Sequence, residues 1–347
     1  MPDMPTVQLT TSLAGNPGGW PEEVLALFER AITVEYATLT RAGAPITYPL
    51  TPYPGESGLT LDVSTGLTYP AKAERARRNP KVALLFSDPV GSGLDDAPVA
   101  LVQGLATVRD ADLQANTDRY VRLGMVKLPA AYEGQPRFLL RQLAWYFARI
   151  WIEVTPTRML WWPAGRLDER PQEWTAPEGI VVPPSDPAPP GRQPGAWSEQ
   201  PAEWRKTAEQ VVRNFPFCDL TVVGTDGFPE CWPAGEVVTA PDGFRIQPSP
   251  GVGPVAEGRA CLTFHTHNPD FTTQENRVFV GRVSRVDDGA LLFGVERLLG
   301  DWSLGGSRLS TTLDFLFGRG RRLRSRLRGE ADRRGQPVPK VRFPGEY

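Results

Sequence analysis

A proline-rich stretch divides the chain and limits how it can fold. Residues 163–201 hold ten prolines in 39 positions, including the run VVPPSDPAPPGRQPG. Proline lacks the backbone N–H and fixes φ, so such a run sustains neither a helix nor a strand ladder. It is typical of an extended, semi-rigid connector. We therefore divide the 347 residues into a first domain (1–162), this linker (163–201), a second domain (202–317) and an arginine-rich tail (318–347).

The composition indicates a folded chain with many turns. Hydrophobic residues make up 40% and charged residues 22%, an ordinary globular balance. The 34 Gly and 36 Pro together are about a fifth of the chain, which disfavours a helical bundle because each is costly inside a helix. They favour short strands joined by turns.

Charge and cysteine content exclude several functional classes. The net charge of −2 provides no broad field toward nucleic acid or an anionic membrane. No apolar run of about 18 residues predicts a membrane span, and the first 20 residues lack the pattern of a secretory signal. Three cysteines without CxxC spacing disfavour a disulfide scaffold or a zinc ribbon. We therefore expect a cytoplasmic protein without a membrane or nucleic-acid partner.

The first half alternates strand patterns with a few helices. Its order is an opening helix, strands, a short basic helix, further strands, a mostly helical region and a closing strand pair. The expected helical segments are 21–31, 70–80 and most of 111–148, and the expected strands are 36–40, 46–50, 58–65, 82–88, 97–110 and a pair within 148–162. This order favours a small barrel with helical insertions over an alternating parallel sheet.

The second half repeats the first in degraded form. FCDLTVVGTDGFP resembles YATLTRAGAP, ACLTFHTHNPD resembles VALLFSDP, and RVFVGRVSRVDDGA resembles VALVQGLATVRDAD. The offsets are 181 for Tyr36 to Phe217, 178 for Phe86 to Phe264 and 177 for Gly104 to Gly281. The basic helix of PAKAERARRNP has no counterpart in SPGVGPVAEGRA. We predict an internal duplication with a mainly β, α+β fold: two tandem barrels, of which the second is degenerate.

Residues 30–162 contain, in order, the motifs YATLT, a G-x-P turn, LDVST, RARRNPKVALLFSD, VQGLATVRD and IWIEVTPTRMLWW. With these motifs in this order, the segment resembles the pyridoxamine 5′-phosphate oxidase-like family of FMN-binding split β-barrels. The terminal Arg and His pair with which pyridoxamine phosphate oxidase itself binds substrate is not found. The resemblance thus implies a flavin-binding split barrel and does not extend to that vitamin-salvage reaction.

The basic helix is the candidate phosphate site. A phosphate needs hydroxyls, backbone N–H groups and cations that converge at a helix start. Ser64 and Thr65 end a strand just before this helix, and Lys72 and Arg75 share one of its faces at i, i+3. The resemblance assigns the phosphate to Ser64, Thr65, Lys72 and, further along, Arg78. The competing interpretation is a solvated basic face with Ser64 and Thr65 as a helix cap.

The resemblance also implies residues beside the flavin ring. Ile46, Thr47 and Tyr48 follow the G-x-P turn and would lie along the ring, while Gln103 would reach a ring or ribose oxygen. Trp162, or its neighbour Trp161, matches an aromatic residue near the cofactor. Without the resemblance, Gln103 reads as a structural polar residue and the tryptophans as packing residues.

Two other features carry less chemistry. The only histidines, His265 and His267, are two residues apart and share one side of an expected strand. Asp270 and Glu275 are the nearby acids, and we predict structural histidines and no metal site. Residues 318–334 hold eight Arg against two acids, which favours a solvated helix or an arm packed on the barrel.

The expected function is an FMN-dependent oxidoreductase that acts on an unidentified small molecule, with no catalytic side chain assigned. The alternatives are a deazaflavin-dependent reductase, a non-catalytic flavin- or haem-binding protein, and a barrel without cofactor. We expect the two halves to pair as an intramolecular pseudo-dimer, or the chain to form a homodimer. Since only the first half keeps the basic helix, we expect one flavin per chain.

Overall fold

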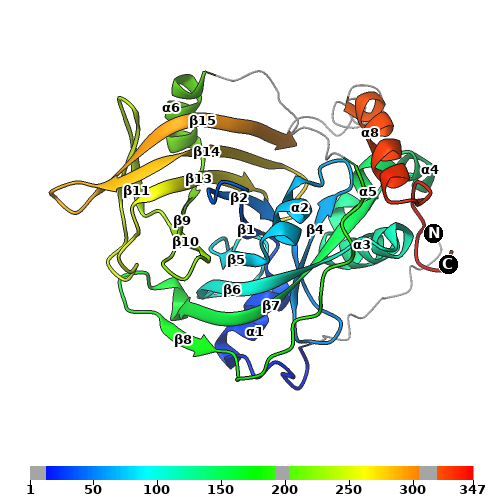
Figure 1. Cartoon of the computed structure of the whole chain (residues 1–347), viewed down its shortest axis with the longest axis horizontal. Coiled ribbons are helices and arrows are strands. Elements are labelled where there is room, and N and C mark those ends of the chain that lie inside the picture. The colour runs from blue at the N-terminus through cyan, green and yellow to red at the C-terminus, as the bar shows by residue number, and fades with distance from the viewer. Residues whose placement is uncertain (1–12, 192–202, 305–318, 347) are drawn as a thin grey trace.

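Two antiparallel sheets, packed against each other, form the molecule (Figure 1). The computed structural model describes residues 13–191, 203–304 and 319–346. The first sheet contains β1 (Val34–Leu39), β2 (Pro45–Leu50), β3 (Pro52–Pro54), β4 (Leu61–Gly66), β5 (Lys81–Phe86), β6 (Val99–Arg109), β7 (Arg149–Trp162) and β8 (Gln172–Thr175). The second contains β9 (Phe217–Val223), β10 (Pro229–Pro233), β11 (Glu236–Ala240), β12 (Gly243–Gln247), β13 (Gly258–His267), β14 (Gln274–Arg285) and β15 (Leu291–Leu304).

The two sheets share one strand order. The first runs β2-β1-β5-β6-β7-β4-β3 and the second β10-β9-β13-β14-β15-β12-β11, so these seven strands of the first sheet each have a counterpart in the second. The eighth strand, β8, pairs with β7 outside this order. The predicted α+β class with two curled antiparallel half-barrel sheets is confirmed. The repeated order is consistent with the predicted duplication.

The predicted alignment of the first strand pair needs a shift of three residues. In the turn after β1, the N–H of Thr40 donates to the carbonyl of Ala44, and in the turn after β9 that of Gly224 donates to Phe228. These matching turns pair Tyr36 with Leu220, not with Phe217. A short sequence similarity does not determine which residues of two strands are equivalent, whereas the geometry of the turns that follow them does.

Helices cover the ends of the first sheet. α1 is an amphipathic helix that buries Val24, Leu27 and Phe28, spaced i, i+3, i+4. α2 joins β4 to β5, and the matching link in the second half, residues 248–257, contains no helix. The helices and 3₁₀ turns are α1 (Glu22–Arg30), α2 (Ala71–Arg78), α3 (Leu113–Lys127), η1 (Pro129–Ala131), α4 (Arg137–Arg141), α5 (Ala144–Phe147), η2 (Pro163–Gly165), α6 (Trp204–Asn214) and α8 (Arg319–Arg333).

The region around the linker differs from the prediction in two respects. Residues 149–162 form one strand of 14 residues rather than a strand pair. The described part of the linker is also held along the first sheet: β8 pairs with β7, and the Asp186 carboxylate accepts hydrogen bonds from the N–H groups of Asp110 and Ala111. Residues 192–202 lie outside the described residues.

The C-terminal helix packs on the first half. Leu323 and Leu327 of α8, together with Val341 and Phe343, belong to the core of the first half. Arg334 reaches Glu74 of α2 and Asp110 through ion pairs. This outcome agrees with the predicted arm packed on the barrel, and residues 305–318 of the predicted tail and second domain lie outside the described residues.

A shared apolar core joins the two sheets. Ala37, Ala83 and Leu85 of the first sheet pack with residues of the second, and Trp162 meets Trp232 edge-to-face at 6.0 Å between ring centres. The halves thus bury a common face. Among the described residues, no helix is both apolar enough and long enough to cross a membrane.

Candidate functional site at the start of α2

A cavity of about 400 Å³ lies where β2, the end of β4 and the start of α2 meet the second half of the chain. Both halves contribute to its lining. The first half supplies Ile46, Tyr48, Pro49, Leu50, Thr51, Ser64, Thr65, Gly66, Thr68, Tyr69, Ala71, Lys72, Arg75, Tyr120, Trp145, Tyr146 and Arg149. The second half supplies Phe271, Gln274, Asn276, Arg297 and Leu299, and α8 adds Arg326.

Three partly buried cations face this cavity without a protein anion. Lys72, Arg75 and Arg149 form no ion pair with a carboxylate in the part of the chain that the structure describes, and no described lining residue is Asp or Glu. Burial, together with the nearby charges of Arg75 and Arg149, lowers the pKa of Lys72 to about 7. Positive charges that burial penalises in this way favour an anionic ligand.

One hydrogen bond orients the guanidinium of Arg75, but not all of its N–H groups have a partner in the described part of the chain. Its Nε donates to Thr38 Oγ1 at 2.8 Å, and its Nη2 has no hydrogen-bond partner among the described residues. The bond to Thr38 of β1 fixes the side chain beneath the cavity. The remaining N–H groups are available to a charge-assisted contact with a phosphate or carboxylate.

The start of α2 adds backbone donors. Pro70 occupies the N-cap position and provides no side-chain hydrogen bond to the helix. Ser64, Thr65 and Gly66 end β4 beside it, and the hydroxyl of Thr65 donates to the carbonyl of Tyr69 at 3.0 Å. An uncapped helix start has unsatisfied N–H groups and a positive dipole end, so with Lys72 beside it this end of the cavity suits an anion.

Aromatic side chains form the rest of the cavity. The ammonium of Lys72 lies 4.5 Å from the centre of the Tyr48 ring, and the guanidinium of Arg149 lies 3.8 Å from that of Tyr120. Trp145 and Phe271 add apolar surface from the two halves. Flat aromatic surfaces next to a cationic end suit a planar ring that carries an anionic arm.

Six of the predicted cofactor residues line this cavity. They are Ile46, Tyr48, Ser64, Thr65, Lys72 and Arg75. The i, i+3 spacing of Lys72 and Arg75 places both on the face of α2 that lines it, as the sequence predicts.

Four predicted residues lie elsewhere. Thr47 alternates with its neighbours on β2, so its hydroxyl faces the second sheet and lies 2.6 Å from that of Thr221. Gln103 donates from Nε2 to the carbonyl of Pro229 at 3.1 Å, between the sheets. Trp162 donates to the carbonyl of Glu169 and packs on Trp232. Arg78 is exposed and does not line the cavity.

Sequence reasoning did not single out several lining residues. Tyr120 and Trp145 come from the helical region, Arg149 begins β7, and Arg326 comes from the C-terminal helix. The arginine-rich composition of 318–334 was the only signal for Arg326, and it pointed to a solvated face equally well.

Comparisons with known proteins give structural similarity alone. No family model matches, and no curated protein matches. Among solved structures, a conserved hypothetical protein of Mycobacterium tuberculosis is 18% identical, with 42% of this chain and 86% of that one covered and a TM-score of 0.32. An F420 reductase is 23% identical over 40% of this chain and 98% of that one, with a TM-score of 0.29. A pyridoxamine 5′-phosphate oxidase-related, FMN-binding protein of Nostoc punctiforme is 18% identical over 38% and 74%, with a TM-score of 0.28.

Proposed function

We propose that the cavity at α2 binds a phosphorylated flavin and that the chain is a flavin-dependent oxidoreductase for a small organic molecule. The observation that carries this proposal is the group of three cations, Lys72, Arg75 and Arg149, which face an aromatic cavity without a carboxylate among the described residues. A flavin mononucleotide combines a dianionic phosphate with a flat, largely apolar ring, and both ends of the cavity suit it.

In this proposal the residues divide by the part of the cofactor that they contact. Lys72 and Arg75, with the N–H groups at the start of α2, bind the phosphate, and the hydroxyls of Ser64 and Thr65 lie beside them. Ile46 and Tyr48 of β2 flank the ring. Gln274 and Asn276 provide polar groups from the second half. A bound flavin supplies the hydride or electron transfer, while the chain orients the substrate and excludes water.

Tyrosine is the only usual axial ligand of haem iron among the described lining residues, since no histidine, cysteine or methionine lines the cavity. A haem would therefore have to bind through a tyrosine such as Tyr48 or Tyr120. A deazaflavin remains the second candidate, because its ring and phosphate place the same demands on the cavity. One of the similar structures is an F420 reductase.

We further propose that the two halves act as an intramolecular pseudo-dimer. α2 exists only in the first half, and the second half closes the cavity through Phe271, Gln274 and Asn276. One chain then binds one flavin.

Titration of the apo-protein with FMN and with riboflavin tests this function. We expect one FMN per chain and at least about 100-fold weaker binding of riboflavin, since two charge-assisted contacts contribute about 1.5–3 kcal/mol each. Two FMN per chain would contradict the single clamp, and equal affinities would contradict the phosphate site. Tight deazaflavin binding with weak FMN binding would assign the second candidate. If a reduced nicotinamide cofactor does not reduce the bound flavin, and added electron acceptors do not reoxidise flavin that dithionite has reduced, the chain would be a flavin-binding protein without oxidoreductase activity.

A further inference from the structure

A second group of titratable side chains lies buried between the two sheets. It comprises Glu35 of β1, Asp88 after β5, Asp219 of β9, and His265 and His267 of β13, and each is buried. No Lys or Arg pairs with these three carboxylates in the described residues. Three buried carboxylates thus share two imidazoles as their only partners of opposite charge, an arrangement that is costly unless something else compensates it.

The contacts converge on one nitrogen. His265 Nε2 lies 2.9 Å from Glu35 Oε1 and 3.2 Å from Asp219 Oδ2. A ring nitrogen carries at most one hydrogen, so it donates well to only one of the two oxygens. The contact with Asp219 has hydrogen-bond geometry, and Glu35 Oε1 is left without a hydrogen bond although it is fully buried. The protein groups alone do not satisfy this centre.

These spacings match the ligands of a metal ion. One ligand atom each from Glu35, Asp219 and His265 lie within 4.8 Å of one another. Ligands at about 2.0–2.2 Å from a tetrahedral ion are about 3.3–3.6 Å apart. The observed contacts of 2.9 and 3.2 Å are slightly shorter, so the three side chains would move apart by a few tenths of an ångström to admit an ion. We propose that Glu35, Asp219 and His265 bind a divalent first-row transition metal, of which Zn²⁺ and Mn²⁺ are the probes. An imidazole with two carboxylates suits such ions better than Mg²⁺ or Ca²⁺, which prefer oxygen ligands alone.

Neighbouring groups orient these ligands. Ser87 Oγ donates to the other oxygen of Glu35 at 3.1 Å. Asp88 Oδ2 lies 3.0 Å from His267 Nε2 and 3.8 Å from His265 Nδ1, on the side of the His265 ring away from the proposed ion. The Phe217 ring stacks on His265 with centres 5.5 Å apart. Of these polar contacts, only the one from Ser87 has hydrogen-bond geometry, whereas Asp88 Oδ2, His265 Nδ1 and His267 Nε2 have no hydrogen-bond partner among the described residues. A hydrogen bond such as that from Ser87 commonly orients a carboxylate ligand of a metal.

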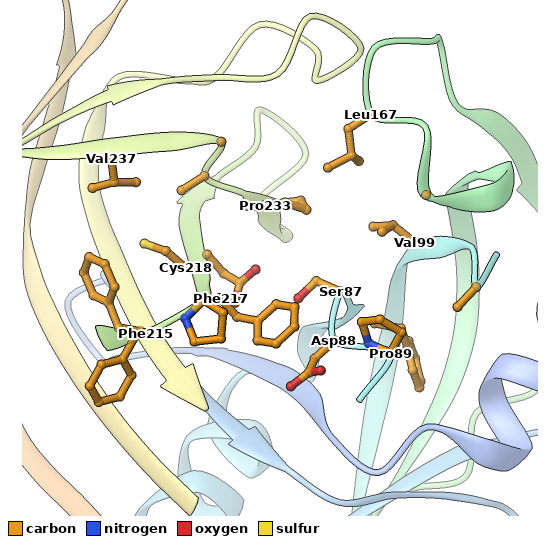
Figure 2. A pocket seen from close by; sticks show the side chains of 18 of the residues that line it. Ser87, Asp88, Pro89, Val99, Leu167, Phe215, Phe217, Cys218, Pro233 and Val237 are labelled. Atoms are coloured by element: carbon orange, nitrogen blue, oxygen red, sulfur yellow. The ribbon is translucent and has the colours of Figure 1, made fainter. Parts of the chain in front are cut away.

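A cavity of about 470 Å³ borders the cluster. Ser87, Asp88 and Asp219 line it, and Figure 2 shows Ser87 and Asp88 on one side with Phe217, Cys218 and Pro233 nearby. It shares no lining residue with the cavity at α2. The proposed ion therefore has a route for a water or a small ligand, as an open metal site needs.

The two cavities hold equivalent places in the two halves. Residues 49–51 around the end of β2 and the β13–β14 turn contribute to the cavity at α2. Residues 233–235 around the end of β10 and the β5–β6 connection contribute to the other. The second half lacks the counterpart of α2. The proposed ion site takes Glu35 from the first half and Asp219 and His265 from the second. The inference does not depend on whether the first cavity binds a flavin.

Metal binding to the full chain tests the inference. After removal of metal with a chelator, we expect calorimetric titration with Zn²⁺ or Mn²⁺ to give one ion per chain and the melting temperature to rise. Glu35→Gln and Asp219→Asn keep the side-chain shape, and each should weaken binding at least about tenfold. Glu275→Gln is the matched control, because this acid follows the histidines in sequence but lies outside the cluster, and it should bind as the wild type does.

A spectroscopic readout on the unmodified chain covers the case in which the variants fail to fold. Co²⁺ bound by His265 and the carboxylates should give visible absorption bands that Zn²⁺ abolishes. If the chain retains no ion and added metal leaves its melting temperature unchanged, the buried carboxylates are neutralised by protonation and not by a metal. That result would overturn the inference. Equal affinities of wild type, Glu35→Gln and Asp219→Asn would overturn the ligand assignment.

Discussion

Lys72 and Tyr48 join the two ends of the cavity at α2: the ammonium group lies 4.5 Å from the centre of the ring. The same lysine lies in the first turn of the helix that would bind the phosphate, and the same tyrosine belongs to the strand that would flank the flavin. A change at Lys72 should therefore affect the charged end of the cofactor first.

Reversal of the charge at Lys72 should weaken FMN binding strongly. Lys72→Glu removes a cation and places a carboxylate near the dianion, so we expect at least a 100-fold rise in Kd, equivalent to about 2.7 kcal/mol. Arg78→Glu is the control, since Arg78 is a basic residue on the same helix that is exposed outside the cavity. Fluorescence quenching of FMN measures both. Equal losses in the two variants would indicate a general electrostatic effect instead of a specific clamp.

FMN binding should weaken as pH rises above 7. Burial and the nearby Arg75 and Arg149 lower the pKa of Lys72 to about 7, below its ordinary value of 10.5. A bound phosphate favours the charged ammonium and raises this pKa, so binding above pH 7 takes up a proton. Between pH 7.5 and 9.5 we expect Kd to rise by up to about tenfold per pH unit. Lys72→Arg should flatten this dependence, because arginine stays charged throughout.

The same pKa shift predicts the stability of the apo-protein. Lys72 is charged up to about pH 10.5 in the unfolded chain but loses its proton near pH 7 in the folded one. The unfolded state thus binds more protons in this window, and stability rises with pH between them. Comparison of wild type and Lys72→Met by urea unfolding at pH 7 and pH 9 isolates this contribution. If Lys72→Met shows the same increase in the free energy of unfolding between pH 7 and pH 9 as the wild type, that increase comes from other titratable groups.

Trp162 should matter for stability and not for the cofactor. It is fully buried against Trp232, donates to Glu169, and does not line the cavity at α2. We expect Trp162→Phe to lower the free energy of unfolding by about 1–3 kcal/mol, through the lost hydrogen bond and the smaller ring, with less than a threefold change in the Kd for FMN. A large loss of FMN affinity with unchanged stability would restore the role that the sequence resemblance implied.

The C-terminal helix α8 should stabilise the first half and, with it, the cavity at α2. Leu327 is buried in the core of the first half, and Arg326 beside it lines the cavity. Leu327→Ala should cost about 2–5 kcal/mol of stability, as for other buried leucines. Arg324→Ala is the surface control, because its side chain is exposed on the same helix. Equal melting temperatures for the two variants would mean that α8 does not hold the first half together.

Local patterns predicted the elements that carry local chemistry. Alternation identified most strands of the first sheet, and the i, i+3 spacing placed Lys72 and Arg75 on one face of α2. The same alternation turns the Thr47 side chain toward the second sheet, so that only the backbone of Thr47 is left for the predicted contact with the ring. The direction of the Thr47 side chain could therefore have been predicted from the strand pattern alone.

Contacts between the halves were beyond sequence reasoning. The only acids considered near His265 were Asp270 and Glu275, whereas its partners Glu35 and Asp219 come from strands 230 and 46 residues away. Which residues of the two sheets come into contact depends on how the sheets pack against each other. That packing is determined by the whole apolar surface of each sheet and not by a single motif. Gln103 shows the same limit, since its partner carbonyl belongs to Pro229 of the other sheet.

The return of α8 to the first half changes what counts as a domain in this chain. Leu323, Leu327 and Phe343 complete a core whose other members precede the linker, and the second sheet lies between these two segments in sequence. The first domain is thus discontinuous, and the second is inserted in it. Truncation at the linker would therefore also remove α8 and leave the core of the first half incomplete.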